Sequence, residues 1–577
     1  MVINALGANI MSYILHDIHI KDKLFLLSVV AIIFCSIPLG IRFAFGGLGS
    51  VMTDKLSIYP LFLGFLLSIY LWSRGRFGIN IDSRLFFLYI TVYGIIVLAS
   101  LIHGLIIYPY MQDVLNGPGG VGQIEKLPGV YVFLHENHVP VTEIGLFKLW
   151  MAARLIKGLA LEIFWTFGMS WMIYCWYKNQ WGKGFSILRN GALISIGIVL
   201  LYSILDVLYL GGSWRAESVL KVLNPIIHGI KNYGYWWPPL LWFGQLRSVF
   251  PEPSFFGIFS AFAVPWLWYS FCKVTYKKTQ SCLAIVFFAY SMCLFFTKAR
   301  TANALFLGEL ILFGLLSLMF KKELLKKYIV LVVCAVCAFG CATFALSHYM
   351  PGSPAKAQAI MESKKKMVAT KPDPSKKAQP LREDENMQGD SMKKYVNDNL
   401  GSLASMNKRS NRARFSVIAA DVNIGLDHPL LGVGRSLRQA YIPDHLPPYA
   451  FKDKEVKGWI NRQKERGILK TGFPAMGEYS VRFAETGIIG LLAYIVPAII
   501  LLYNMVVNVR NKSLVLDDRI RFGFWLLSFV GILASGIGDN LNITYAFWLM
   551  LGLGYAMCFG KKGSSKPGCV KKAELHH

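Results

Sequence analysis

The sequence predicts an all-α polytopic membrane protein with about 12 transmembrane helices. Hydrophobic residues make up 54% of its 577 residues, and the mean hydropathy is +0.45. Apolar runs recur along the chain, and a helix of about 20 apolar residues crosses the hydrocarbon core of a bilayer. Charged residues are only 16% of the chain, and Lys and Arg collect between these runs. Together these features exclude an ordinary soluble fold.

Twelve apolar runs are long enough to be predicted as spans. In chain order they cover 24–41, 56–72, 85–109, 151–177, 190–210, 254–272, 281–297, 302–320, 328–347, 484–508, 520–537 and 542–560. The spans divide the chain into a first membrane region (1–347), a large polar loop (348–483), a second membrane region (484–560) and a tail (561–577). We expect short helices within the large loop.

Every second connection between the predicted spans is basic. The basic residues are Lys21 and Lys23; Arg74, Arg76 and Arg84; Lys178, Lys183 and Arg189; Lys273, Lys277 and Lys278; the KKELLKK run at 321–327; Arg510, Lys512 and Arg519; and Lys561, Lys562 and Lys566. Short loops rich in Lys and Arg remain in the cytoplasm. Both termini are therefore predicted to be cytoplasmic. The formal net charge of +27 indicates anionic lipid headgroups or a phosphorylated lipid as partners, and not nucleic acid.

The opposite face receives the connections with unusual chemistry. They are 110–150, 211–253, 297–302, 348–483 and 538–542. The large loop holds 24 Lys and Arg against 14 Asp and Glu, although long translocated segments need no basic residues for orientation. Its first part, low in apolar residues and broken by Pro, is expected to be mobile. Helices are predicted over 393–407 and 410–426, the second with an apolar stripe of Phe415, Ile418, Ala419 and Val422.

Three arginines begin the helix predicted over 410–426. Arg409 and Arg412 share a helix face, while Arg414 points elsewhere. Guanidinium groups bind phosphate oxygens in a bidentate manner and keep their charge at a membrane surface. A solvated basic face is the alternative interpretation. Further along, Arg435 follows a glycine-rich turn, which on its own is weak evidence for a phosphate site.

Two charged residues stand at the starts of predicted spans on the same face. Arg300 lies at the mouth of the span 302–320, as an anchor or as a deliberately placed charge. Glu252 and Pro253 open the span 254–272, where the carboxylate meets the positive end of a helix. Glu252 needs a partner, for which Arg247, Arg215 and Arg300 are candidates. A charged helix cap without further function is the alternative.

The ten cysteines lie within or beside predicted spans, so no disulfide framework is expected. Cys334, Cys337 and Cys341 share one helix face, which would fit a metal site or tight helix packing. Packing is favoured, because no His or acidic residue is close in sequence. We therefore predict no metal and no cofactor.

Two motifs together resemble a known family. The sequence DHPLLGVG at 427–434, and AETGIIGLL at 484–492 opening a span, look like the O-antigen ligase and polymerase superfamily. TKARTA at 297–302 resembles that family's arginine-bearing turn, and EPSFFG at 252–257 resembles a segment of its polymerase branch. The match covers roughly 245–310 and 405–500. Arg414 and Gly425 also show the R-x10-G spacing of polymerase loops, as do Arg466 and Gly477.

The resemblance implies a metal-independent glycosyltransferase in a bacterial inner membrane, with its active site facing the periplasm. Its donor and acceptor would be glycans on undecaprenyl diphosphate, and a chain-length regulator is a further candidate partner. An acceptor hydroxyl would attack the anomeric carbon, and the lipid diphosphate would leave. Cations must then surround the diphosphate. Arg300, Arg412 and Arg414 are proposed for this role, with Arg409 and Arg435 as further phosphate ligands and Arg300 and Arg414 counted as catalytic.

The general base is less clear from the motifs. Members of the family often have a His-Asn pair where this chain has Met476 and Gly477. Glu252 is therefore the first candidate for the base, Glu478 the second, and a histidine from elsewhere, such as His445, the third.

Three functions remain open at this level. A polymerase that joins lipid-linked repeat units is favoured by EPSFFG. A ligase that moves the glycan onto lipid A-core or a protein is the alternative within the enzyme class. A flippase or exporter for lipid-linked glycans would need inward-facing charges along the spans, and none is expected from the sequence.

Overall fold

The protein is all-helical in a computed structural model that describes residues 20–35, 37, 55–74, 81–123, 127–228, 244–349, 395–397, 401, 409–469 and 471–561. No strand occurs among these residues. Seven of the described helices are long and apolar enough to cross a membrane. The chain is thus membrane-embedded by the length and composition of its helices.

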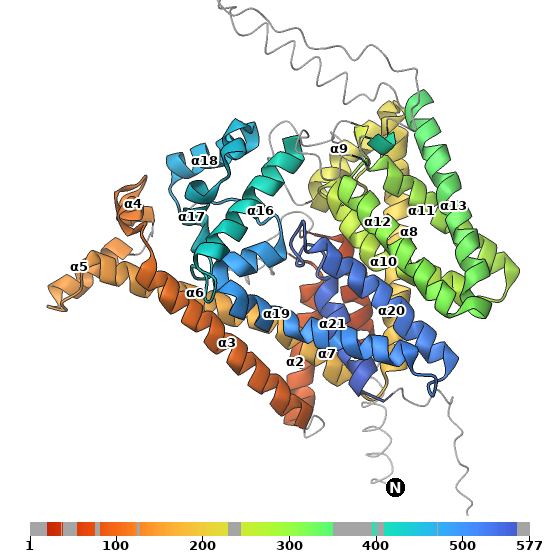
Figure 1. Cartoon of the computed structure of the whole chain (residues 1–577), viewed down its shortest axis with the longest axis horizontal. Coiled ribbons are helices and arrows are strands. Elements are labelled where there is room, and N and C mark those ends of the chain that lie inside the picture. The colour runs from red at the N-terminus through yellow and green to blue at the C-terminus, as the bar shows by residue number, and fades with distance from the viewer. Residues whose placement is uncertain are drawn as a thin grey trace, which may run out of the picture.

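The helices follow one another closely (Figure 1). After a helix over 20–30 and η1 (Ala31–Ile33), the first membrane region contains α2 (Ile58–Ser73), α3 (Ile81–Ile107), α4 (Met111–Asn116), η5 (Gly120–Gln123), α5 (Leu127–Glu136), α6 (Glu143–Ile163), η6 (Phe164–Gly168), α7 (Met169–Tyr177), α8 (Trp181–Leu210), α9 (Trp214–His228), α10 (Pro253–Lys273), α11 (Lys277–Phe296), α12 (Arg300–Met319) and α13 (Lys321–His348). The rest contains α16 (Arg409–Asp427), α17 (Arg438–His445), η10 (Pro448–Lys452), α18 (Lys454–Arg466), α19 (Glu478–Arg510), α20 (Leu516–Ser535) and α21 (Ala546–Phe559).

Most predicted spans coincide with a helix, within a few residues at each end. The largest differences are in the first and fourth spans. The described helix of the first ends by Ile33, and 36 and 38–54 lie outside the described residues. The fourth is α6 and α7 joined by a π-helical turn, and it begins earlier, at Glu143. The predicted loop segment 361–390 and most of the predicted helix 393–407 also lie outside the described residues.

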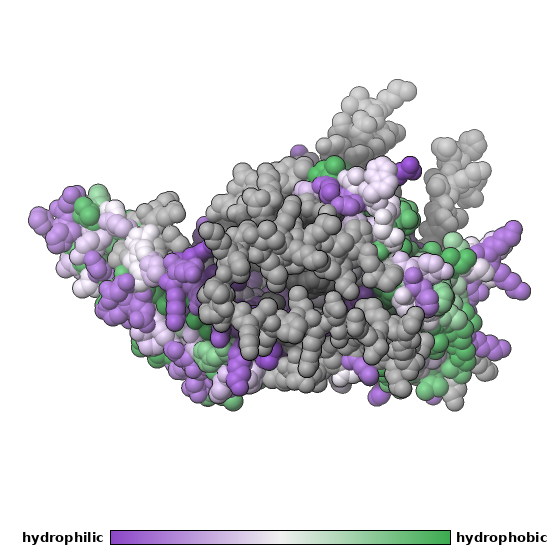
Figure 2. All heavy atoms as spheres, turned by 90° about the horizontal axis from the view of Figure 1, so that it is seen from above, coloured by the Kyte–Doolittle hydropathy of each residue, from purple (hydrophilic) through white to green (hydrophobic). Residues whose placement is uncertain are grey.

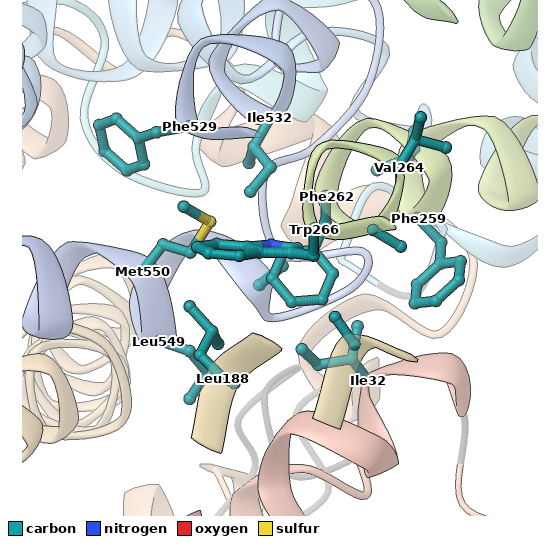
Figure 3. Packing of buried hydrophobic residues seen from close by; sticks show 14 of the residues in the cluster. Ile32, Leu188, Phe259, Phe262, Val264, Trp266, Phe529, Ile532, Leu549 and Met550 are labelled. Atoms are coloured by element: carbon teal, nitrogen blue, oxygen red, sulfur yellow. The ribbon is translucent and has the colours of Figure 1, made fainter. Parts of the chain in front are cut away.

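Helix α10 forms the centre of the bundle. Every residue from Phe256 to Cys272 is buried, because this span is apolar on all sides. Figure 3 shows Trp266 between Ile532 and Met550 on one side and Leu188 on the other. Burying large aromatic side chains contributes most of the packing energy of such a core. Residues before and after α10 are thereby held firmly at the two ends of the bundle.

The predicted basic connections come together at one end of the bundle. Lys183 forms an ion pair with Asp22, and Lys273 forms one with Asp517. The amide of Lys561 donates to the carbonyl oxygen of Lys178. These contacts join connections that are far apart in the sequence.

The flanks of the bundle are apolar. On α13, Val333 and Val336 are 55% and 63% exposed. Figure 2 shows hydrophobic side chains on the flank where Figure 1 has α11 to α13, and hydrophilic side chains at the far end, where α4 and α5 project. An exposed apolar belt of this kind suits contact with lipid chains.

Helices α16, α17 and α18 pack together beside the first part of α19 (Figure 1). The turn after α16 is inserted between α3 and α19. The amides of Val433 and Gly434 donate to the carbonyl oxygens of Ala484 and Glu485, at 3.0 and 2.9 Å. On the other side, a Cβ atom on Gly104 would lie 2.1 Å from the carbonyl oxygen of Val433. The turn is therefore fixed by backbone contacts on both faces.

A kink in α19 makes this insertion possible. Gly487 has φ 61° and ψ −168°, a conformation that is essentially restricted to glycine. A Cβ atom there would lie 2.3 Å from the carbonyl carbon of Leu430.

Replacing Gly487 should therefore destabilise the protein. We expect Gly487→Ala to lower the free energy of unfolding by about 1–3 kcal/mol, the usual cost of a strained backbone. Thermal unfolding in detergent measures the change. Gly340→Ala in α13 is the matched control, because a Cβ atom on Gly340 meets nothing within 4 Å. Equal stability of the two variants would contradict the role of the kink.

Candidate functional site

Arg414 is the centre of a charged cluster at the end of the bundle opposite the basic connections. It projects from the first half of α16, and its Nη1 atom donates to Asp539 Oδ2 at 3.1 Å and to the Gly538 carbonyl oxygen at 3.0 Å. Its side chain is 28% exposed, whereas that of Asp539 is 8% exposed. Among the described residues both bonds use Nη1, so Nε and Nη2 are left to face a ligand. Arg414 is thus held firmly and remains accessible.

Glu252 belongs to the same cluster. It is the residue before Pro253, the first residue of α10, and its carboxylate does not cap the helix. Its Oε2 atom accepts a bond from Ser254 Oγ at 3.3 Å, and Arg414 is the strongest charge acting on it. The predicted partners were different. Arg247 is buried near Asp206, and Arg215 stacks on Trp214.

Arg300 is brought to this cluster by the packing of α12 on α10. One turn below the start of each helix, a Cβ atom on Gly257 would lie 2.5 Å from the Cα atom of Ala302. The two helix starts are therefore adjacent. Arg300 is near enough to Arg414 for the two charges to repel each other. We call Arg414, Asp539, Glu252 and Arg300 the Arg414 cluster.

The two carboxyl groups of this cluster are unusually basic. Burial raises the pKa of Glu252 above its ordinary value, and the attraction of Arg414 offsets only part of that rise. Burial raises the pKa of Asp539 in the same way, again against the effect of Arg414. A carboxylate with a raised pKa is a better proton acceptor at neutral pH. Because Asp539 is bonded to Arg414, Glu252 is the carboxylate available for this role.

A second charged group lies directly beside the first. Arg482 donates to Glu162 Oε1 at 2.6 Å and to Glu478 Oε1 at 2.9 Å, and Arg435 forms an ion pair with the other oxygen of Glu162. We call these four residues the Glu162 network. The amide of Glu478 donates to the carbonyl oxygen of Asp539 at 3.1 Å, which connects the network to the Arg414 cluster.

The structure separates the predicted phosphate-binding residues. Arg300 and Arg414 lie together, whereas Arg435 is 18% exposed and paired with Glu162. Arg412 pairs with Asp453 on η10–α18, at 3.3 Å, so it points away from Arg414 as predicted. Arg409 begins α16, and its side chain lies outside the described part of the chain.

The candidate bases are separated as well. Glu478 is 2% exposed and bonded to Arg482, which keeps its carboxylate engaged. His445 bonds to Asp427 at the last residue of α16. Asp427 is thirteen residues after Arg414, which corresponds to about 20 Å along a helix. Only Glu252 lies in the Arg414 cluster.

Several charged residues of these groups were not predicted. Asp539 lies in a turn that was recognised as chemically unusual, but it was not singled out. Glu162 and Arg482 are charges inside or beside predicted spans, which is itself a functional signal. The expectation that no charge faces inward along the spans is wrong. Glu309, in the middle of α12, is 2% exposed and lies against Gly531.

A buried ion pair also stabilises the region of α16 and α17. Arg438 Nη1 lies 2.6 Å from Asp421 Oδ1, and the two side chains are 2% and 0% exposed. Burial raises the pKa of Asp421 to about 6, although Arg438 opposes the rise. Removing one member of such a pair leaves an uncompensated charge in the interior.

We therefore expect Arg438→Ala to lower the free energy of unfolding by about 3–5 kcal/mol. Chemical or thermal unfolding in detergent measures the loss. Adding Asp421→Asn should restore part of it, because the stranded charge is then removed. Arg462→Ala on the exposed face of α18 is the control and should change little. A loss in Arg438→Ala no larger than in this control would show that the pair does not stabilise the fold.

Comparison with models of known protein families and with curated proteins finds no match for this chain. Function is therefore inferred from the residues and contacts described above.

Proposed function

We propose that this protein polymerises lipid-linked oligosaccharide repeat units into a polysaccharide. The observation that carries the proposal is the Arg414 cluster, in which two arginines and a carboxylate of raised pKa meet at one end of a membrane-embedded bundle. Two guanidinium groups suit a diphosphate, and a basic carboxylate suits the activation of a hydroxyl. The resemblance of 427–434 and 484–492 to the O-antigen polymerase and ligase superfamily supports the same class of reaction.

Each group has a definite task in this reaction. Glu252 takes the proton of an acceptor sugar hydroxyl, and the oxygen forms a bond to the anomeric carbon of the donor sugar. The bond between that carbon and the diphosphate oxygen breaks, and its electron pair stays with the diphosphate. Arg414 and Arg300 stabilise the charge that develops there. The products are a lengthened glycan, still on its lipid, and a free polyprenyl diphosphate.

The proposal also includes the orientation. The connections at the opposite end carry the basic residues, which assigns that end to the cytoplasm by the distribution of Lys and Arg. The Arg414 cluster then faces the periplasm of a bacterial inner membrane, and about 12 spans support it. Labelling single cysteines placed at 457 and 512 with a membrane-impermeant reagent tests this. Reaction at 457 alone is expected in intact spheroplasts, and reaction at 512 alone would reverse the assignment.

Incubation of the purified protein with a lipid-linked repeat unit tests the function. Glycans of increasing length on the same lipid would support polymerisation. Transfer only to a second acceptor, such as lipid A-core or a protein, would support a ligase instead. Movement of the lipid across a vesicle membrane without any new linkage would reject both enzymes in favour of a flippase.

A chelator should leave the rate of polymerisation unchanged. The reason is that Arg414 and Arg300 occupy the position next to the diphosphate that a divalent cation would need. Polymerisation assays with and without EDTA measure this. Loss of activity that is restored by Mg²⁺ or Mn²⁺ would contradict the assignment of the two arginines to the diphosphate.

A further inference from the structure

An apolar groove lies between α8, α9 and the segments on either side of them. It is lined by Phe34, Ile198, Leu201, Tyr202, Leu205, Ile227 and Val249 and has a volume of about 490 Å³. The four lining residues of α8 are spaced so that they share one helix face. Apart from the Tyr202 hydroxyl, which is bonded to Asn224, these side chains offer only hydrocarbon to an occupant.

The groove opens onto a surface that is exposed and apolar. On the same helix Leu201 is 70% exposed, Ile204 54% and Leu208 49%. Helix α8 is one of the seven helices suited to cross the membrane. An occupant of the groove therefore enters from the hydrocarbon layer and not from water.

One end of the groove is next to the Arg414 cluster. Val249 is three residues before Glu252, so their Cα atoms are at most about 11 Å apart. On the other wall Phe34 precedes Cys35, whose thiol is close enough to Glu252 to interact with it electrostatically. From Leu205 to Ile198 the groove extends about 8 to 18 Å below the last residue of α8. Cations at one end and hydrocarbon along the rest match a lipid with an anionic head.

A buried contact fixes the wall of the groove relative to Glu252. Asp206 Oδ2 accepts bonds from the amides of Arg247 and Ser248, at 3.2 and 2.7 Å, and Ser248 has a positive φ of 55°. The amide of Leu246 donates to the carbonyl oxygen of Phe296, at the end of α11. The segment that contributes Val249 is therefore rigidly placed between α8 and α11.

We propose that this groove binds the isoprenoid chain of a polyprenyl diphosphate, with the diphosphate at Arg414 and Arg300. The inference rests on the proposed function for the identity of the headgroup. It adds the place and depth of the chain, and it makes Ile198, Leu205 and Ile227 determinants of the chain length that the protein accepts. The ordinary acyl chain of a phospholipid is the competing occupant.

Filling the groove tests the proposal. Ile198→Trp should raise the KM for a donor with a full-length isoprenoid chain about tenfold, and leave the KM for a donor with a two-isoprene chain unchanged. Ile194→Trp is the matched control, because Ile194 is 46% exposed on the same helix and does not line the groove. Turnover of the short donor shows that the variant is folded. Equal effects on both donors, or no effect on either, would overturn the proposal.

Direct labelling separates this inference from the proposed reaction. A polyprenyl diphosphate with a photoactivatable diazirine in its chain should label peptides containing 198–205, and unlabelled polyprenyl diphosphate should suppress the labelling. This result can be obtained even if the protein forms no glycosidic bond. Labelling at other helices would overturn the groove, as would equal suppression by a phospholipid of the same chain length.

Discussion

Replacing Arg414 with alanine should lower kcat for polymerisation about a hundred- to a thousandfold while the protein still folds. The guanidinium is held by Asp539 and Gly538 through Nη1 and is only 28% exposed, so it is preorganised toward the charge that develops on the leaving diphosphate. Removing one preorganised donor of this kind typically costs that much. Initial rates at saturating donor measure the effect.

Two further variants give this prediction its control. Arg414→Lys keeps a positive charge but loses the bidentate geometry, so it should recover only part of the rate. Arg462→Ala removes an arginine from the exposed face of α18 and should leave the rate unchanged. A loss smaller than about tenfold in Arg414→Ala, with normal unfolding, would remove Arg414 from the reaction.

Replacing Glu252 with glutamine should lower kcat about a hundredfold or more, because Gln cannot accept the proton of the attacking hydroxyl. The pH dependence adds a second test. A base works only when deprotonated, so the wild-type rate should fall as the pH falls through the pKa of Glu252. Burial raises that pKa above its ordinary value of 4.5, and the fall should start at a correspondingly higher pH.

In Glu252→Gln the residual rate should lose this acidic limb. Glu217→Gln, in which a carboxylate on α9 paired with Lys221 is removed, is the control and should keep the wild-type profile. An unchanged acidic limb in Glu252→Gln would assign the titration to another group and reject Glu252 as the base.

The spans could be predicted because their signal is local. Helix α10 begins at Pro253 and ends at Lys273, close to the predicted 254–272, since a Glu-Pro start and a continuous apolar run mark both boundaries. The short helices of the connections were missed, including α9 and α18. For α18 a signal was present, because Asp453 accepts bonds from the amides of Glu455 and Val456 as an N-cap.

Helix α16 shows how a correct helix can be given a wrong buried face. The predicted stripe contained Val422, which is 36% exposed. The buried face instead carries Val417, Ala420 and Asp421. Asp421 can be buried because Arg438, seventeen residues later, pairs with it. A hydrophobicity pattern treats such a residue as exposed, so the face was assigned incorrectly.

The composition of the Arg414 cluster was only partly accessible to sequence reasoning. Arg300, Arg414 and Glu252 were singled out because each stands at a helix start on the same predicted face. Their mutual proximity, and the role of Asp539, depend on contacts over more than a hundred residues. The 125 residues between Arg414 and Asp539 leave no local signal of the pair.

The stoichiometry of lipid release is the most direct test of the central claim. The purified wild-type protein and a radiolabelled lipid-linked repeat unit should produce one free polyprenyl diphosphate for each new glycosidic linkage, and Arg414→Ala should produce almost none of either. Chain growth without release of the lipid diphosphate, or release at the wild-type rate in Arg414→Ala, would contradict the claim that the Arg414 cluster is the site of glycosyl transfer.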